Sequence, residues 1–144
     1  MNQNVCVLKK IMVVVIKMTN DLYSCKICGK IISLIEPKDN DTICCNQPMD
    51  LIEEKTNESE GKEKHVPIIE KEGELILVKV GSIEHPMEED HYIKLIQLVK
   101  EGKVLLEKRL EPGDSPLVKF YSSENFEKVK ARALCNKHGL WISK

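Results

Sequence analysis

Four cysteines lie within a segment of 34 residues that contains few apolar side chains. They form the pair Cys25-x-x-Cys28 and, after fifteen intervening residues, the adjacent pair Cys44-Cys45. A chain of fewer than about 40 residues usually needs a metal, disulfides or oligomerisation in order to fold. A Cys-x-x-Cys turn brings two thiolates to one ion, and four thiolates suit zinc or iron. We therefore predict that residues 19–55 form a small module that folds around a metal ion.

The adjacent pair constrains this module further. Neighbouring side chains on an extended backbone point to opposite faces, so the backbone must bend if Cys44 and Cys45 are to share one ion. The spacing by itself leaves structural zinc and an iron–thiolate site both open. A disulfide framework is the remaining alternative for the six cysteines, but adjacent cysteines form only a strained disulfide, and we favour metal ligation in a reducing compartment.

The N-terminal part of the chain carries the longest apolar run, residues 11–16. A membrane span needs about 20 apolar residues, and the core of a secretory signal needs about 7 to 15. We expect a cytoplasmic protein that does not associate with membranes. Residues 1–18 are interpreted as an extension that is disordered or follows from a misassigned start, so Cys6 needs no function.

The remainder of the chain, residues 56–144, shows the pattern of a β domain. Apolar, strand-like runs at 75–80, 91–99, 104–106 and 117–121 are separated by turn signals at Glu101-Gly102 and at 111–116. Such spacing predicts an antiparallel sandwich. Residues 126–135 fit both helical and strand periodicity, and we favour a strand. The chain has 22 Lys and Arg against 23 Asp and Glu, and this balance argues against a nucleic-acid partner.

A second potential ligand set lies in this β domain. All four histidines of the chain and one cysteine fall close to turns, in three short groups: Glu63-Lys64-His65-Val66-Pro67, residues 85–92 with His85 and His91, and residues 135–139 with Cys135 and His138. Four imidazoles and one thiolate exceed a tetrahedral zinc site and leave a sixth position open, which indicates a reactive metal. The alternative is that the histidines are ordinary surface or core residues.

These motifs resemble those of the superoxide reductases of the desulfoferrodoxin family. The resemblance runs from about Leu22 to Trp141, and the segment around Cys25, Cys28, Cys44 and Cys45 is similar to the desulforedoxin-type module, which binds one iron. It implies a mostly β chain in which an immunoglobulin-like antiparallel β-sandwich follows this module. It also implies two iron ions per chain, one in a four-cysteine site and one in a His4Cys site, the latter with four histidines and one cysteine.

The resemblance further implies a role for each residue of the second group. The equatorial iron ligands would be His65, His85, His91 and His138. Cys135 would be the axial thiolate, Glu63 the carboxylate that can occupy the sixth position, and Lys64 the cation that attracts superoxide.

The activity implied is superoxide reductase, the one-electron reduction of superoxide to hydrogen peroxide. The iron would be re-reduced by an external donor such as rubredoxin, and the chain would form a homodimer. Two other functions remain open at this point: a pure iron electron-transfer protein, and a structural module held together by zinc. Dismutase activity, which would release oxygen as well as peroxide, is a variant of the enzyme hypothesis.

Overall fold

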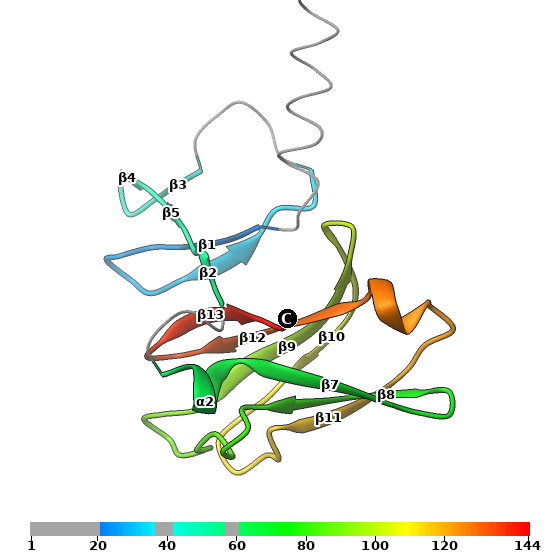
Figure 1. Ribbon diagram of the computed structural model, residues 1–144. Helices are drawn as coiled ribbons and strands as arrows, with labels where there is room; N and C mark the ends of the chain where they lie inside the picture. The colour runs from blue at the N-terminus through cyan, green and yellow to red at the C-terminus, as the bar shows by residue number, and fades with distance from the viewer. Residues whose placement is uncertain (1–20, 37–41, 57–60) are drawn as a thin grey trace, which may run out of the picture. The chain divides into compact units, whose positions relative to one another are not determined.

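The computed structural model describes residues 21–36, 42–56 and 61–144. The predictions for residues 1–18 lie outside these residues. The chain divides into two compact units, residues 1–52 and 53–144 (Figure 1). The regular elements of both units are mainly strands, and the mostly β class that the resemblance implies is confirmed. None of the helices in the described residues is long and apolar enough to cross a membrane.

The first unit contains very short strands. β1 (Leu22–Ser24) pairs with β2 (Ile31–Ser33) and with β5 (Asp50–Leu51), and a separate hairpin joins β3 (Ile43–Cys44) to β4 (Gln47–Pro48). Among its described apolar residues, only Leu22, Cys25 and Met49 are buried. So small a core agrees with the expectation that this unit depends on a metal ion for its stability.

The second unit is a sandwich of two sheets. The larger sheet has the order β10-β9-β12-β13-β6, and the smaller sheet has the order β11-β8-β7. All neighbouring strands are antiparallel except β13 and β6. The bounds of the strands are β6 (Glu54–Lys55), β7 (Pro67–Glu72), β8 (Leu75–Val80), β9 (Ile93–Lys100), β10 (Lys103–Arg109), β11 (Leu117–Tyr121), β12 (Lys130–Cys135) and β13 (Gly139–Ile142). The predicted antiparallel sandwich is confirmed.

Aliphatic side chains fill the space between the two sheets. Every second residue of β8 is buried, namely Ile76, Val78 and Val80, and these side chains belong to one cluster with Ile96 and Leu98 of β9. Removing a side chain of this size from water stabilises the folded state by about 1.5–3 kcal/mol. The core therefore consists mainly of Ile, Leu and Val, in keeping with an aromatic content of only 4%.

Most predicted elements lie where the sequence places them. Strands β8 and β11 have the predicted bounds. In the turn between β9 and β10, Glu101 and Gly102 have φ values of 50° and 77°, as a two-residue turn with positive φ at both positions requires. Residues 126–135, whose pattern fits both a helix and a strand, begin with a short 3-10 turn, η1 (Phe126–Lys128), and continue as strand β12. Strands β6, β7 and β13 and the short helix α2 (Lys62–His65) were not predicted from the sequence.

Candidate metal centres

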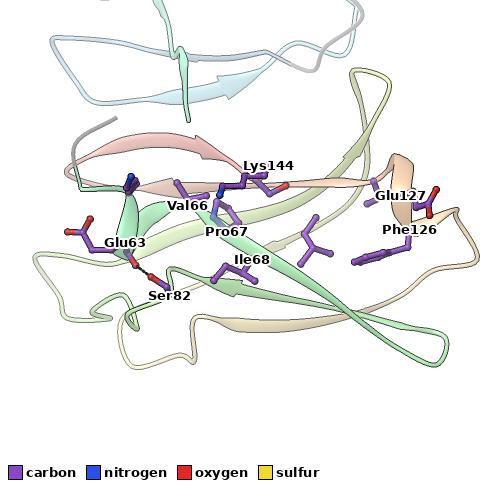
Figure 2. A pocket seen from close by; sticks show the side chains of 12 residues that line it. Glu63, Val66, Pro67, Ile68, Ser82, Phe126, Glu127 and Lys144 are labelled. Atoms are coloured by element: carbon purple, nitrogen blue, oxygen red, sulfur yellow. Dashed lines mark hydrogen bonds between the residues drawn. The ribbon is translucent and has the colours of Figure 1, made fainter. Parts of the chain in front are cut away.

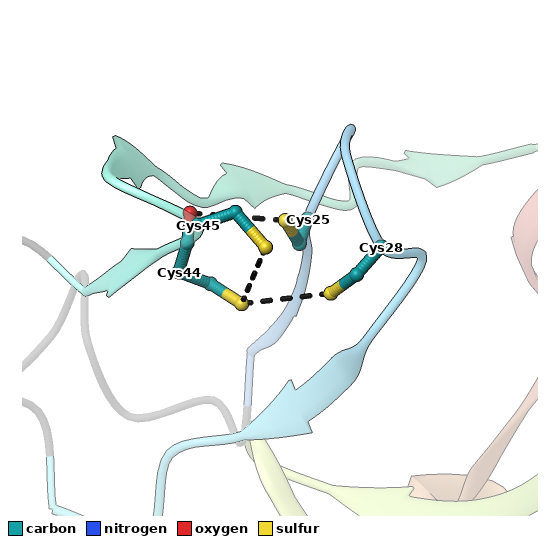
Figure 3. A group of neighbouring side chains, drawn as sticks. All are labelled: Cys25, Cys28, Cys44 and Cys45. Carbon is teal, nitrogen blue, oxygen red and sulfur yellow. Dashed lines mark hydrogen bonds between the residues drawn. The ribbon is translucent and has the colours of Figure 1, made fainter.

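Two tight turns of the first unit carry the four cysteines. Cys25 and Cys28 lie in the turn between β1 and β2, in which the amide of Gly29 donates to the carbonyl of Cys25 at 3.0 Å. Gly29 has a φ of 76°, a conformation that glycine adopts without strain. Cys44 ends β3, and Cys45 begins the turn to β4. The two turns present all four thiols to one point (Figure 3).

The backbone conformation at Cys45 explains how adjacent cysteines face the same point. Cys45 and Asn46 have φ values of 53° and 61°, and the residues on either side of them, Cys44 and Gln47, are paired across the hairpin. This is the two-residue turn in which both positions have positive φ. A residue other than glycine pays about 1–3 kcal/mol for such a conformation. The predicted bend of the backbone is present, and it leaves the Sγ atoms of Cys44 and Cys45 3.9 Å apart.

The sulfur positions fit one tetrahedral ion. The Sγ atoms of Cys28 and Cys44 are 3.6 Å apart, and all four Sγ atoms lie within 4.8 Å of one another. Metal–sulfur bonds of about 2.3 Å give an edge of about 3.8 Å between the ligands of a tetrahedron. A backbone hydrogen bond from Cys28 lowers the pKa of Cys25 to about 6, whereas the hydrogen bond with Cys28 raises the pKa of Cys44 to about 12. The thiols therefore disfavour joint ionisation unless a cation lies between them.

The second ligand set comes from four separate segments of the sandwich. His65 ends α2, His85 and His91 lie in the connection between β8 and β9, Cys135 ends β12, and His138 lies in the turn to β13. The potential ligand atoms of His65, His85, His91 and Cys135 all lie within 4.8 Å of one another. His65, His85 and Cys135 are buried, so this cluster begins at the edge of the core.

The four imidazoles form a closed square. Neighbouring ring centroids are separated by 4.8 Å between His65 and His85, 4.7 Å between His85 and His91, 4.9 Å between His91 and His138, and 4.7 Å between His138 and His65. The diagonal from His65 to His91 is 6.3 Å. Neighbouring rings are nearly perpendicular, at 70° to 74°. Four donors arranged in this way can occupy the equatorial plane of one ion.

The nitrogen positions support the same geometry. Nδ1 of His138 lies 3.1 Å from Nε2 of His65 and 3.1 Å from Nε2 of His91. Two nitrogens bound at about 2.1 Å and at a right angle would lie about 3.0 Å apart. The Sγ atom of Cys135 lies 3.7 Å from Nδ1 of His138 and provides a fifth donor. His138 thus faces the cluster through Nδ1, whereas His65 and His91 face it through Nε2.

Backbone carbonyls fix the tautomers of the two buried histidines. Nδ1 of His65 donates to the carbonyl of Gly61 at 2.8 Å, and Nδ1 of His85 donates to the carbonyl of Pro86 at 2.6 Å. The Nε2 atoms are then unprotonated and free to bind a metal. Nε2 of His85 is buried and has no hydrogen-bond partner among the described residues, a situation that costs about 1–3 kcal/mol. A metal ion at this point would satisfy it.

Burial keeps these imidazoles in the form that binds metals. It is the main cause that lowers the pKa of His85 to about 4, and it also lowers the pKa values of His65 and His91. A neutral imidazole is a metal ligand, whereas a protonated one is not. The donors, their spacing and the neutral state that burial favours at His65, His85 and His91 fit a metal ion in a His4Cys environment.

Glu63 and Lys64 lie on α2, directly before His65, and both side chains are exposed. The carbonyl of Glu63 accepts hydrogen bonds from the amide of Ile83 at 2.9 Å and from Oγ of Ser82 at 3.1 Å. Its carboxylate lies at the rim of a mostly apolar groove of about 570 Å³ (Figure 2). Within the described residues, no hydrogen bond or ion pair joins the side chain of Glu63 or Lys64 to the imidazoles.

Two supporting residues were not assigned a role from the sequence. Asn136 holds both neighbours of His91, because its Oδ1 accepts from the amide of Tyr92 and its Nδ2 donates to the carbonyl of Asp90, each at 3.0 Å. The ring of Trp141 stacks on His65 at 4.8 Å and 17°, and its Nε1 donates to the carbonyl of His138 at 3.0 Å. Only the fold shows what these side chains touch, so the motif alone could not identify their contacts.

Comparison with known proteins agrees with both donor sets. The sequence profile described as "Desulfoferrodoxin" matches residues 57–144, and the profile "Desulfoferrodoxin, N-terminal domain" matches residues 17–52. A desulfoferrodoxin homolog of Archaeoglobus fulgidus is 49% identical over 122 residues, which cover 85% of this chain and 94% of that protein. A superoxide reductase of Thermococcus kodakarensis is 38% identical over 95 residues, 55% of this chain and 83% of that protein.

A solved structure agrees with the fold. The crystal structure of the superoxide reductase from Treponema pallidum has a TM-score of 0.66 at 28% identity and covers 86% of this chain and 96% of that one. The sandwich and the module that precedes it are thus those expected from the sequence. The four-cysteine and His4Cys sites are consistent with two iron ions per chain. On this evidence the chain belongs to the desulfoferrodoxin family and is similar to superoxide reductases.

Proposed function

We propose that the protein is a superoxide reductase that converts superoxide, one electron and two protons into hydrogen peroxide. The observation that carries this proposal is the square of four imidazoles with a single thiolate as the fifth donor. Five donors leave one position of a six-coordinate ion for a small ligand. Iron bound there would supply the electron.

We assign the ligand roles to His65, His85, His91, His138 and Cys135. The carbonyls of Gly61 and Pro86 orient two of the rings, and Asn136 holds the segment that carries His91. Cys135 is buried, with 2% of its surface exposed. A thiolate in this position is shielded from water and would donate electron density to a bound iron, as thiolate ligands do in haem proteins.

Glu63 and Lys64 act at the open position in this proposal. Both precede His65 on α2, and both are in contact with solvent. The carboxylate of Glu63 would provide a further ligand for a bound iron when no substrate is present. The ammonium group of Lys64 raises the local concentration of the superoxide anion, because a positive charge near a site accelerates the encounter with an anion.

The four-cysteine site has a different role in the same proposal. Its four sulfurs complete a tetrahedron, so no position remains for superoxide. The site can then serve only in electron transfer or in stabilising its unit. We propose that an external rubredoxin-like protein supplies the electrons and that the chain works as a homodimer in the cytoplasm.

Metal analysis and fast kinetics on the anaerobically purified chain test the proposal. We expect two iron ions per chain, visible absorption from ferric thiolate, and peroxide as the product when the reduced protein is mixed with superoxide in pulse radiolysis. A colourless zinc protein would support the structural alternative. Iron sites that change oxidation state without forming peroxide from superoxide would support a pure electron carrier, and release of oxygen would indicate a dismutase.

The role of Lys64 has its own test. Lys64→Ala should slow the bimolecular reaction with superoxide and flatten its dependence on salt, because the Debye length falls to about 10 Å at 0.1 M salt. Lys71→Ala, which removes an exposed lysine of β7, provides a control of equal charge. An unchanged rate and an unchanged salt slope in Lys64→Ala would exclude this role.

A further inference from the structure

One lysine outside the family motifs contacts the backbone of the His4Cys centre. Lys55 lies in β6, and its Nζ donates to the carbonyl of His138 at 2.8 Å. The same Nζ lies 5.3 Å from the centroid of the Trp141 ring, within the range of a cation–π contact. Residues 53–64 are nearly all polar, so a solvated side chain is the ordinary expectation for Lys55.

The carbonyl of His138 is held from two sides. Nε1 of Trp141 donates to it at 3.0 Å, in addition to the bond from Lys55. The Trp141 ring also stacks on His65, so it contacts a second histidine of the square. Lys55 and Trp141 together therefore fix the turn that carries His138 and the ring that supports His65.

The pairing of β6 explains how Lys55 reaches this turn. β6 runs parallel to β13, with Glu54 opposite Leu140 and Lys55 opposite Trp141. Oε1 of Glu54 accepts from Nη1 of Arg132 at 3.0 Å, and this guanidinium is buried in the larger sheet. A short strand of two residues is thus anchored by a salt bridge on one residue and by the Lys55 contacts on the next.

The side chain of Lys55 passes close to the glycine that follows His138. Gly139 follows His138 and has a φ of 83°, and a Cβ atom built on it would lie 3.7 Å from Nζ and 3.8 Å from Cε of Lys55. The end of the lysine side chain therefore lies against the turn that joins His138 to β13.

We propose that Lys55 is a positioning residue of the His4Cys centre, which orients His138 through its carbonyl and places a fixed positive charge beside the ligands. The inference rests on the proposed iron site. A nearby positive charge disfavours the more highly charged ferric state, so Lys55 raises the reduction potential of the iron. The carbonyl contact also slows loss of the metal, because it restrains one of the five ligands.

Three substitutions separate the charge from the hydrogen bond. Lys55→Met removes both, Lys55→Gln retains a donor without charge, and Lys55→Arg retains charge and donors. Lys71→Met changes the net charge by the same amount on β7 and is the matched control. The experiment uses the full-length, iron-loaded protein and measures the reduction potential of the His4Cys centre from its visible band, together with the rate at which a chelator removes that iron.

We expect a lower potential and several-fold faster iron loss in Lys55→Met, a lower potential alone in Lys55→Gln, and values close to the parent protein in Lys55→Arg and Lys71→Met. The shift in potential should shrink at high salt, because Lys55 is exposed. A potential and an iron-loss rate in Lys55→Met equal to those of the parent would overturn the inference. Neither measurement uses superoxide. An iron-loaded protein that forms no peroxide would therefore refute the proposed function, whereas the role of Lys55 would still be decided by the reduction potential and the iron-loss rate.

Discussion

The pKa of His85 predicts that the metal-free second unit loses stability in mild acid. In the folded chain burial lowers this pKa from 6.5 to about 4, whereas in the unfolded chain it returns to about 6.5. Between these values the unfolded state binds a proton that the folded state does not. The free energy of unfolding therefore falls as the pH falls through this window, and His85 makes no contribution above it.

The size of the effect follows from the width of the window. Each unit of pKa difference corresponds to about 1.4 kcal/mol, so a difference of about 2.5 units gives about 3 kcal/mol for His85. The side chain is 1% exposed, so little solvent screens it. Burial also lowers the pKa values of His65 and His91. Both histidines also lower the free energy of unfolding as the pH falls, so the total loss should exceed the loss due to His85 alone.

Urea unfolding of the metal-free protein between pH 7.5 and 4 measures this loss. The chain has a single tryptophan, Trp141, which stacks on His65, so its fluorescence reports the second unit. His85→Gln removes the titrating group and is the control, because carboxylates titrate equally in both proteins. Between pH 7.5 and 4, the parent protein should lose about 3 kcal/mol more unfolding free energy than His85→Gln loses. Equal slopes in the two proteins, or a parent protein whose unfolding free energy does not change with pH, would refute the reasoning.

Three further predictions concern single side chains of the two sites. Cys28→Ser should remove one iron and leave superoxide reduction largely intact; iron analysis and pulse radiolysis check this, and a folded variant with no activity would show that the sites are not independent. Cys135→Ser should nearly abolish turnover even where the histidines retain iron, because a hydroxyl oxygen donates less charge than a thiolate, and a fully active variant would remove the thiolate from the mechanism. Asn136→Ala should lower the free energy of unfolding by about 1–3 kcal/mol through the loss of two hydrogen bonds at 3.0 Å. Lys137→Ala, which removes only the exposed 3.4 Å ion pair with Asp90, should change it by less than about 1 kcal/mol, and equal effects in the two variants would contradict the role of Asn136.

The strands that could be predicted from the sequence are those whose bounds follow from local apolar runs and turn residues. The apolar run of β8 and the turn signals before β11 are local, and both strands have the expected bounds. β7 begins at a proline and ends in charged residues, and β13 has only four residues. β6 has two residues and forms only because β13 offers a parallel partner. Short edge strands of this kind depend on tertiary pairing, which a local pattern does not contain.

The residues that supply the donor atoms could be predicted from the sequence, but the geometry of those atoms could not. Spacing indicates that Cys44 and Cys45 need a bend, but the positive φ at Cys45 and Asn46 becomes evident only in the hairpin. Likewise, no feature of the sequence shows that His138 faces the cluster through Nδ1. That choice depends on the turn between β12 and β13, which the side-chain amide of Asn136 and the ring of Trp141 hold in place.

The same buried contacts connect metal binding with stability. The fold brings imidazole nitrogens to 3.1 Å from each other and leaves Nε2 of His85 without a partner among the described residues. Such an arrangement destabilises the metal-free chain, since buried acceptors lose their bonds to water. A cation at the centre of the square offsets this loss, because it interacts with every one of these nitrogens at once. The acid sensitivity of the metal-free unit and its affinity for a metal are therefore two consequences of one feature, the neutral, converging imidazoles that the sandwich holds in place.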